Sequence, residues 1–436
     1  MRLLKGGKGF AYSLKRIIKL GVYSSLSSVF ALSLYANYRH KSKIDGFKEF
    51  KQIKEVTQTL TNTFAETVTE QLSQHLQVNP QKFETLSDKG KIRFLENLLN
   101  DPEGRVSQNF KVPKNLKNQV LFWFKVFNIY SNTDIILHNI NEPWKIYTVV
   151  DTSGLSGKER FLKVREALKQ FPQYQNQIRQ QQGMKNSVAF ALEKSGRYMK
   201  NMEKIFRENK LPVELVRLPI VESSFNPQAY SKVGAAGLWQ FMRKTGKHFL
   251  ESINTHIDER LSPFKATEAA AQLLKENFQI LGSWPLAVSA YHHGPGLILK
   301  AKKVLGTNDL GVMISTFNHP QYQFASKNYY TEFLAAVYTE KYHDKLFEDL
   351  EKEKPLKYDD VILGYSMRVK AIMDICRISL EELKLYNPDL KTQAFQSSYY
   401  LPENHWLKLP QGKKKYMDQF HKEAEEARKF MEGLKS

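Results

Sequence analysis

Cysteine is nearly absent from this chain of 436 residues, because Cys376 is the only one. A single thiol cannot form a disulfide within the chain, so no internal cross-link stabilises the fold. Cys376 lies in an apolar helical pattern, which predicts a buried structural thiol. No cysteine stands near the N-terminus, so a lipid anchor attached through a cysteine is excluded there.

Ligands with the spacing of a metal site are also missing. His292 and His293 are adjacent, but neighbouring side chains are expected to diverge, and no third ligand accompanies them at a zinc spacing. The sequence therefore predicts no metal and no cofactor. It also contains no low-complexity block and no nucleic-acid-binding motif, and nothing in it defines the oligomeric state.

Acidic residues are outnumbered by basic ones, 45 against 65, which gives a net charge of +20. This imbalance predicts an anionic partner. Nucleic acid, acidic lipid and peptidoglycan with its peptide carboxylates all fit the charge, so the charge alone does not choose among them.

The N-terminus has the pattern of a targeting segment. Several basic residues precede an uncharged, moderately apolar stretch at residues 20–38, and Arg39, Lys41 and Lys43 follow it. We expect residues 1–38 to be a signal peptide or a signal anchor. The stretch is about 20 residues long, as a membrane span requires, so attachment to a membrane through residues 20–38 remains open beside cleavage.

Residues 39–182 are polar and mainly helical in pattern. Apolar residues recur every three or four positions over residues 47–76, which predicts a long amphipathic helix. The aromatic run at residues 120–130 predicts a buried helix, and residues 135–138 and 145–150 predict two short strands.

The most informative stretch is residues 211–240. Pro212 at the first position predicts a short apolar helix that Pro219 kinks just before Glu222. A carboxyl group among hydrocarbon side chains holds its proton more tightly, as a general acid at neutral pH requires. From this spacing alone, an exposed Glu at a helix end is an equally good interpretation.

Four linked segments add a resemblance. They are Glu222-Ser223, residues 225–227 (Phe-Asn-Pro), residues 229–231 (Ala-Tyr-Ser) and residues 234–240 (Gly-Ala-Ala-Gly-Leu-Trp-Gln). This set resembles the lytic transglycosylases that share the goose-type lysozyme fold, and in particular the membrane-bound D type. Trp239 stands where the wider family has Met, as in the D type.

The resemblance implies a set of functional residues. Glu222 would be the catalytic acid and then the base, and the substrate-binding residues would be Ser223, Ser231, Gln240, Tyr291, His292 and Tyr329. His292 replaces an Asn of the family pattern and would titrate at mildly acidic pH. Ala325 stands where relatives often have a Glu, four residues before the Tyr.

The predicted architecture is mainly α. It comprises a helical N-terminal extension, a goose-type lysozyme-like catalytic domain at residues 183–345, a small α+β LysM-like module at residues 356–412 and an amphipathic helical tail at residues 413–436. Within the catalytic domain, residues 266–281 predict a helix closed by Gly282, and a further helix starts at Pro285. Asp258 beside Arg260 predicts a cap or an ion pair rather than a second catalytic carboxylate.

The implied function is non-hydrolytic cleavage of peptidoglycan glycan strands in the periplasm, after export across the inner membrane. Most glycosidases use two carboxylates, and the sequence offers no convincing partner for Glu222. Two alternatives stay open: a lysozyme-like hydrolytic muramidase, which needs a second carboxylate or an ordered water, and a non-catalytic peptidoglycan-binding envelope protein.

Overall fold

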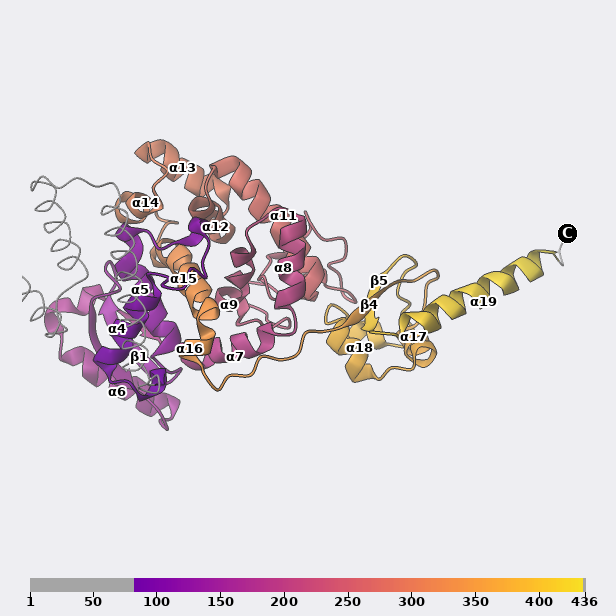
Figure 1. Ribbon diagram of the computed structural model, residues 1–436, viewed down its shortest axis with the longest axis horizontal. Coiled ribbons are helices and arrows are strands. Elements are labelled where there is room, and N and C mark those ends of the chain that lie inside the picture. The colour runs from indigo at the N-terminus through magenta and orange to yellow at the C-terminus, as the bar shows by residue number, and fades with distance from the viewer. Residues whose placement is uncertain (1–81, 434–436) are drawn as a thin grey trace, which may run out of the picture. The chain divides into compact units, whose positions relative to one another are not determined.

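The computed structural model describes residues 82–433 (Figure 1). The N-terminal targeting segment and the long helix predicted over residues 47–76 lie outside the described residues. Within residues 82–433, no helix is both long and apolar enough to span a bilayer.

The first part of the described chain combines helices with a small sheet. Strand β1 (Asp134–Asn139) pairs antiparallel with β2 (Ile146–Asp151) on one side and with β3 (Ile178–Gln182) on the other. The helix predicted over the aromatic run is confirmed as α5 (Lys117–Asn128), and so are the first two strands. Strand β3 was not predicted, so the part of residues 39–182 that the structure describes is less helical than expected. Its other elements are η1 (Phe83–Thr85), α4 (Asp88–Leu98), η2 (Gln108–Phe110), η3 (Lys114–Leu116), α6 (Gly157–Lys169) and η4 (Pro172–Gln177).

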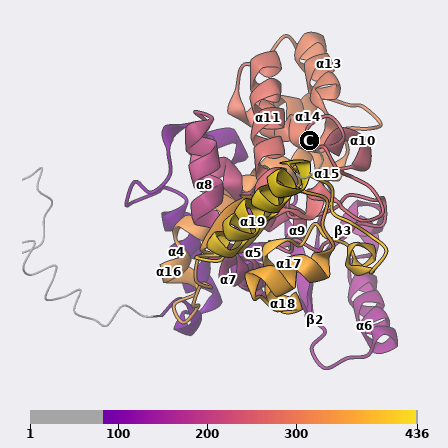
Figure 2. The ribbon, with the colours of Figure 1, turned by 90° about the vertical axis from the view of Figure 1, so that its right-hand side faces the viewer.

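The next part is helical. Its elements are α7 (Lys185–Ser195), α8 (Met199–Glu208), η5 (Val213–Arg217), α9 (Leu218–Ser223), α10 (Arg243–Gly246), η6 (Glu259–Leu261), α11 (Pro263–Leu281), α12 (Trp284–His293), α13 (Pro295–Leu305), α14 (Leu310–Thr316), α15 (Phe324–Lys341) and α16 (His343–Leu346). The helix predicted before Gly282 is confirmed as α11, since Gly282 ends it in the left-handed conformation at φ 77°. Helices α11 and α13 run side by side (Figure 2).

Helix α15 is the centre of this part. It packs against α5, α9 and α12 (Figure 1). The Trp123 indole N–H of α5 donates to Asn328 Oδ1 at 2.9 Å, and the Asn128 amide donates to Thr339 Oγ1 at 2.8 Å. Since these polar atoms are buried, each bond satisfies a group that would otherwise be costly. The N-terminal helix α5 therefore fixes the position of α15.

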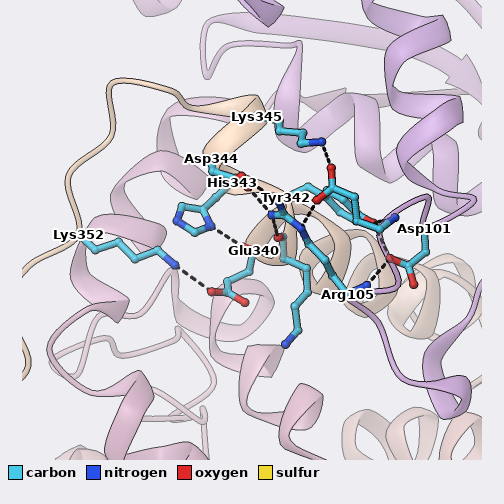
Figure 3. A network of polar contacts seen from close by, with 10 residues as sticks. Asp101, Arg105, Glu340, Tyr342, His343, Asp344, Lys345 and Lys352 are labelled. Carbon is cyan, nitrogen blue, oxygen red and sulfur yellow. Dashed lines mark hydrogen bonds and ion pairs between the residues drawn. The ribbon is translucent and has the colours of Figure 1, made fainter. Parts of the chain in front are cut away.

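A network of charged residues surrounds the C-terminal end of α15 (Figure 3). Lys352 donates to Glu340 Oε1 at 2.9 Å, and Arg105 forms two hydrogen bonds with the carboxylate of Asp344. Tyr342 donates to the buried carboxylate of Asp101. These contacts attach the segment after α4 to the end of α15 and to α16.

The C-terminal part has the order strand, helix, helix and strand, which agrees with the predicted mixture of helix and strand. It consists of β4 (Tyr358–Ile362), α17 (Val369–Cys376), α18 (Leu380–Tyr386), η7 (Thr392–Phe395) and β5 (Trp406–Pro410), followed by α19 (Lys414–Gly433). Strands β4 and β5 pair antiparallel. Cys376 is a buried free thiol, as predicted, within a separate hydrophobic core.

Candidate active site

Glu222 lies at the end of a short helix that begins and ends abruptly. Pro212 is the N-cap of η5 rather than its first residue, and Pro219 lies in the first turn of α9, so the single kinked helix that we expected is two helices. Proline is tolerated there because the first turn has no partner for its N–H groups. After α9, Ser224 and Phe225 both have positive φ, at 50° and 55°. This reversal places Glu222 beside the loop that follows.

The Glu222 carboxyl is in the desolvated environment that its apolar neighbours predict. Burial raises its pKa to about 7. The hydroxyl of Tyr329 donates to Oε1, which favours the charged form and opposes part of this rise. The group is only half-buried, so one side remains open. A carboxyl group with this pKa can both give up and accept a proton near neutral pH.

Tyr291 and His292 of α12 border the same carboxyl group. The Tyr291 hydroxyl donates to the carbonyl oxygen of Trp239 at 2.8 Å. Burial, and after it the charge of Glu222, raise the Tyr291 pKa above its usual value. The His292 ring stacks on Tyr329, with centroids 4.8 Å apart and an angle of 19°. The site therefore brings Glu222, Tyr291, His292 and Tyr329 together.

Two expectations for the histidines were wrong. Desolvation, with the neighbouring His293, lowers the His292 pKa to about 4, so that His292 stays neutral at mildly acidic pH. The rings of His292 and His293 do not diverge, because they meet edge to face with centroids 4.3 Å apart. Within residues 82–433, no group of three His, Cys, Asp or Glu side chains is arranged to hold a metal ion.

The other three predicted site residues bind the backbone around Glu222. The Ser223 hydroxyl donates to Leu238 O at 2.8 Å, and Ser231 Oγ accepts from Ala235 N at 2.9 Å. The Gln240 amide donates to Gly237 O at 2.8 Å. Each contact holds the loop of residues 229–241 in place.

This loop rests on a buried ion pair. Arg260 contacts Asp258 at 2.7 Å and donates to Gly234 O at 2.8 Å and Phe241 O at 3.0 Å. The cap or ion pair predicted for Asp258 is confirmed, since its side chain also accepts from Arg260 N. The backbone of Gly237, which has φ 80°, passes so close to Arg260 that an added Cβ would lie 1.8 Å from Arg260 O. Only glycine fits there.

Trp239 is a core residue. It is fully buried, its ring stacks on Phe206 with centroids 5.8 Å apart, and its N–H donates to Thr267 Oγ1 at 2.9 Å. Because the indole is buried, Trp239 contributes to the site only through its backbone carbonyl oxygen, which accepts the hydrogen bond from Tyr291.

Two ionisable residues near the site were not predicted. Glu332, on α15, lies one turn after Tyr329, and Arg179, on β3, places its guanidinium 4.1 Å from the centroid of the Phe324 ring. Burial and the charge of Glu222 raise the pKa of Glu332, and Arg179 opposes this rise. Helical spacing from Tyr329 could have indicated Glu332, whereas no local pattern pointed to Arg179.

Comparison with known proteins finds matches over part of the chain. Residues 200–310 match the transglycosylase SLT domain. The membrane-bound lytic murein transglycosylase D of Escherichia coli is 29% identical over 196 residues, which cover 44% of this chain and 42% of that protein. A putative tributyltin chloride resistance protein of Alteromonas sp. is 36% identical over 97 residues, which cover 22% of this chain and 46% of that protein.

These alignments are partial, since the chain spans less than half the length of the curated relatives that it matches. Among solved structures, the 70 kDa soluble lytic transglycosylase of Escherichia coli has 19% identity and a TM-score of 0.29, over 34% of this chain and 24% of that one.

Proposed function

We propose that this chain is a peptidoglycan lytic transglycosylase, because residues 200–310 match the transglycosylase SLT domain. It cleaves the β-1,4 bond between N-acetylmuramic acid and N-acetylglucosamine without water and leaves a 1,6-anhydro end. The observation that carries this proposal is Glu222, a half-buried carboxyl group with a pKa of about 7 and a tyrosine hydroxyl on its Oε1.

Glu222 acts first as an acid. Its proton passes to the glycosidic oxygen while the bond from C1 of the muramoyl unit to that oxygen breaks. The acetamido carbonyl of the same sugar attacks C1 and compensates the positive charge, as in glycosidases that use substrate assistance. Near pH 7, a substantial fraction of Glu222 carries the required proton.

Glu222 then acts as a base. The carboxylate takes the proton from the muramoyl 6-hydroxyl, O6 forms a bond to C1, and the acetamido oxygen leaves C1. Glu222 is protonated again at the end, and no water is consumed. The hydrogen bond from Tyr329 stabilises the ionised form between the two steps.

The surrounding residues position the glycan and the acid. Tyr329 orients the Glu222 carboxyl, and Tyr291 fixes the loop at Trp239 O. His292, neutral and exposed on its outer side, offers one donor or acceptor to the sugar. Ser231 and Gln240 border the glycan from the loop of residues 229–241, and Ser223 holds that loop against α9.

The remaining parts have supporting roles in this proposal. Residues 1–38 direct export to the periplasm, either cleaved or retained as an anchor. Residues 183–345 are the catalytic domain, which the described part of residues 39–182 supports through α5. Residues 356–412 are a LysM-like module that contacts glycan, in agreement with their order of strand, helix, helix and strand. Helix α19 is an amphipathic tail whose first turns pack on this module through Met417.

Release of soluble muropeptides from purified peptidoglycan tests the activity. The purified full chain should release fragments, and Glu222→Gln should bind the same peptidoglycan and release none. Binding without release by the unmodified chain would instead identify a non-catalytic peptidoglycan-binding protein.

A further inference from the structure

Helix α15 is buried over most of its length. From Asn328 to Glu340, every residue is buried except Glu332, which is only half-buried. Tyr329 and Glu332 lie one helical turn apart, so their side chains leave α15 on the same face. The half-buried Glu332 therefore lies on the face of α15 that carries the hydrogen bond to Glu222.

Glu222, Tyr329 and Glu332 are close enough to act on one another electrostatically. The charge of Glu222 raises the pKa of Glu332, and the charge of Glu332 contributes to raising that of Tyr329. Helix α9, which carries Glu222, packs directly on α15. Both carboxyl groups are half-buried, so each remains partly open to solvent.

The surroundings of Glu332 keep its carboxyl group uncharged. Burial and the Glu222 charge raise its pKa to about 8, and Arg179 of β3 opposes this only in part. The histidine on α12 that stacks on Tyr329 is neutral above about pH 4, and Tyr291 of the same helix holds its proton firmly. At neutral pH Glu332 is thus a carboxylic acid with an O–H to donate.

That donor has no protein acceptor. Within residues 82–433, no hydrogen bond or ion pair engages the Glu332 carboxyl. By contrast, Glu222 accepts a hydrogen bond from Tyr329, and Glu340 forms ion pairs with Arg217 and Lys352. A half-buried polar group without a partner is costly unless a ligand or water satisfies it.

We propose that Glu332 donates a hydrogen bond to an acetamido or hydroxyl oxygen of the glycan held beside Glu222. This role rests on the proposed function and adds a second carboxyl group to the site. A protonated Glu332 cannot activate a water molecule as a base, so the group positions the sugar and does not turn the enzyme into a hydrolase. Glu332 is then a substrate-binding residue rather than a structural one.

Glycan binding, measured without turnover, tests the role of Glu332. The Glu222→Gln full chain is titrated with a soluble tetrasaccharide of alternating N-acetylglucosamine and N-acetylmuramic acid, alone and combined with Glu332→Gln or Glu332→Ala. Gln retains an N–H donor, so its affinity should stay within about threefold of the Glu222→Gln parent, whereas Ala should bind roughly tenfold more weakly, as the loss of one hydrogen bond implies. Glu276→Ala, an exposed change on α11, is the control and should bind like the parent.

Turnover separates the remaining possibilities. With Glu222 intact, Glu332→Gln should release peptidoglycan at nearly the normal rate, and Glu332→Ala should raise KM more than it lowers kcat. The proposal would be overturned if the Glu332→Gln variant, the Glu332→Ala variant and the parent bound the tetrasaccharide with equal affinity. It would also be overturned if Glu332→Gln were as inactive as Glu332→Ala, because a base and not a donor would then be needed. If the affinities differ as expected but the unmodified chain releases no fragments, the proposed function fails while the glycan contact stands.

Discussion

Arg217 donates two hydrogen bonds, at 2.9 and 2.7 Å, to a single oxygen of Glu340, and both side chains are almost fully buried. Arg217 ends η5, directly before the helix that carries Glu222, and Glu340 lies near the end of α15, the helix that carries Tyr329. The pair therefore ties together the two helices whose side chains meet at the site. A third group, Lys352, contacts the other oxygen of Glu340 at 2.9 Å (Figure 3).

Replacing Glu340 by Gln should destabilise the protein strongly. Arg217 would stay buried with Glu203, 2.6 Å away, as its remaining counter-charge, so we expect a loss of about 3 kcal/mol in the free energy of unfolding, the lower end of the range for a broken buried pair. Urea unfolding measures this loss. Glu208→Gln is the control. Glu208 is exposed, and its Oε1 lies 3.7 Å from Lys204 Nζ, so this variant should change the free energy of unfolding by less than about 0.5 kcal/mol.

The same pair predicts a pH dependence of stability. The folded-state pKa of Glu340 is lowered to about 2, below its usual value of about 4.3. Its contribution is thus fully present above about pH 4.3 and is lost as pH falls toward 2. As pH falls from 5 to 3, the free energies of unfolding of the unmodified protein and of Glu340→Gln should converge. A constant difference between them would contradict the lowered pKa of Glu340.

Replacing two glycines of the loop beside Glu222 by alanine should lower the stability by different amounts. Gly234 has φ 88° with no atom within 4 Å of an added Cβ, so Gly234→Ala should cost only the left-handed conformation, about 1–2 kcal/mol. Gly237→Ala should cost more, because its Cβ would collide with Arg260 O. It should also reduce kcat/KM, since Gln240 and Trp239 O would move. Thermal unfolding with kinetics of the folded variants checks both, and similar behaviour of the two variants would argue against this loop geometry.

Tyr329→Phe should change the pH profile as well as the rate. The hydrogen bond from Tyr329 lowers the Glu222 pKa, so its loss should move the alkaline limb of kcat/KM to higher pH. Without the bond we also expect kcat to fall roughly tenfold, because the ionised intermediate state loses a donor. Tyr330→Phe removes a buried hydroxyl that does not contact Glu222 and should leave the profile in place; an identical shift in both variants would point to a general effect on folding.

For the unmodified enzyme, kcat/KM should decrease as pH rises through about 7. Glu222 must be protonated to act as the acid, and its pKa is about 7. His292 should add no limb between pH 5 and pH 6.5, because it is already neutral there. A pH series of initial rates checks both points, with circular dichroism at each pH to exclude unfolding. A rate that keeps rising to pH 9 would contradict the acid role of Glu222.

The sequence predicted well what local pattern determines. The environment of Glu222, the end of α11 at Gly282 and the Asp258–Arg260 pair all follow from neighbouring residues. Strand β3 was missed because its polar residues show no strand pattern, and it pairs through its backbone with β1. The importance of Glu332 was also missed, since it depends on which face of α15 lies beside α9.

The measurement that tests the central claim most directly is mass spectrometry of the muropeptides that the purified full chain releases from peptidoglycan. The account predicts products lighter than hydrolytic ones by one water, about 18 Da, because the 6-hydroxyl and not water closes on C1. These products should be absent with Glu222→Gln. Hydrated reducing ends from the unmodified chain would contradict the account and would identify a lysozyme-like muramidase.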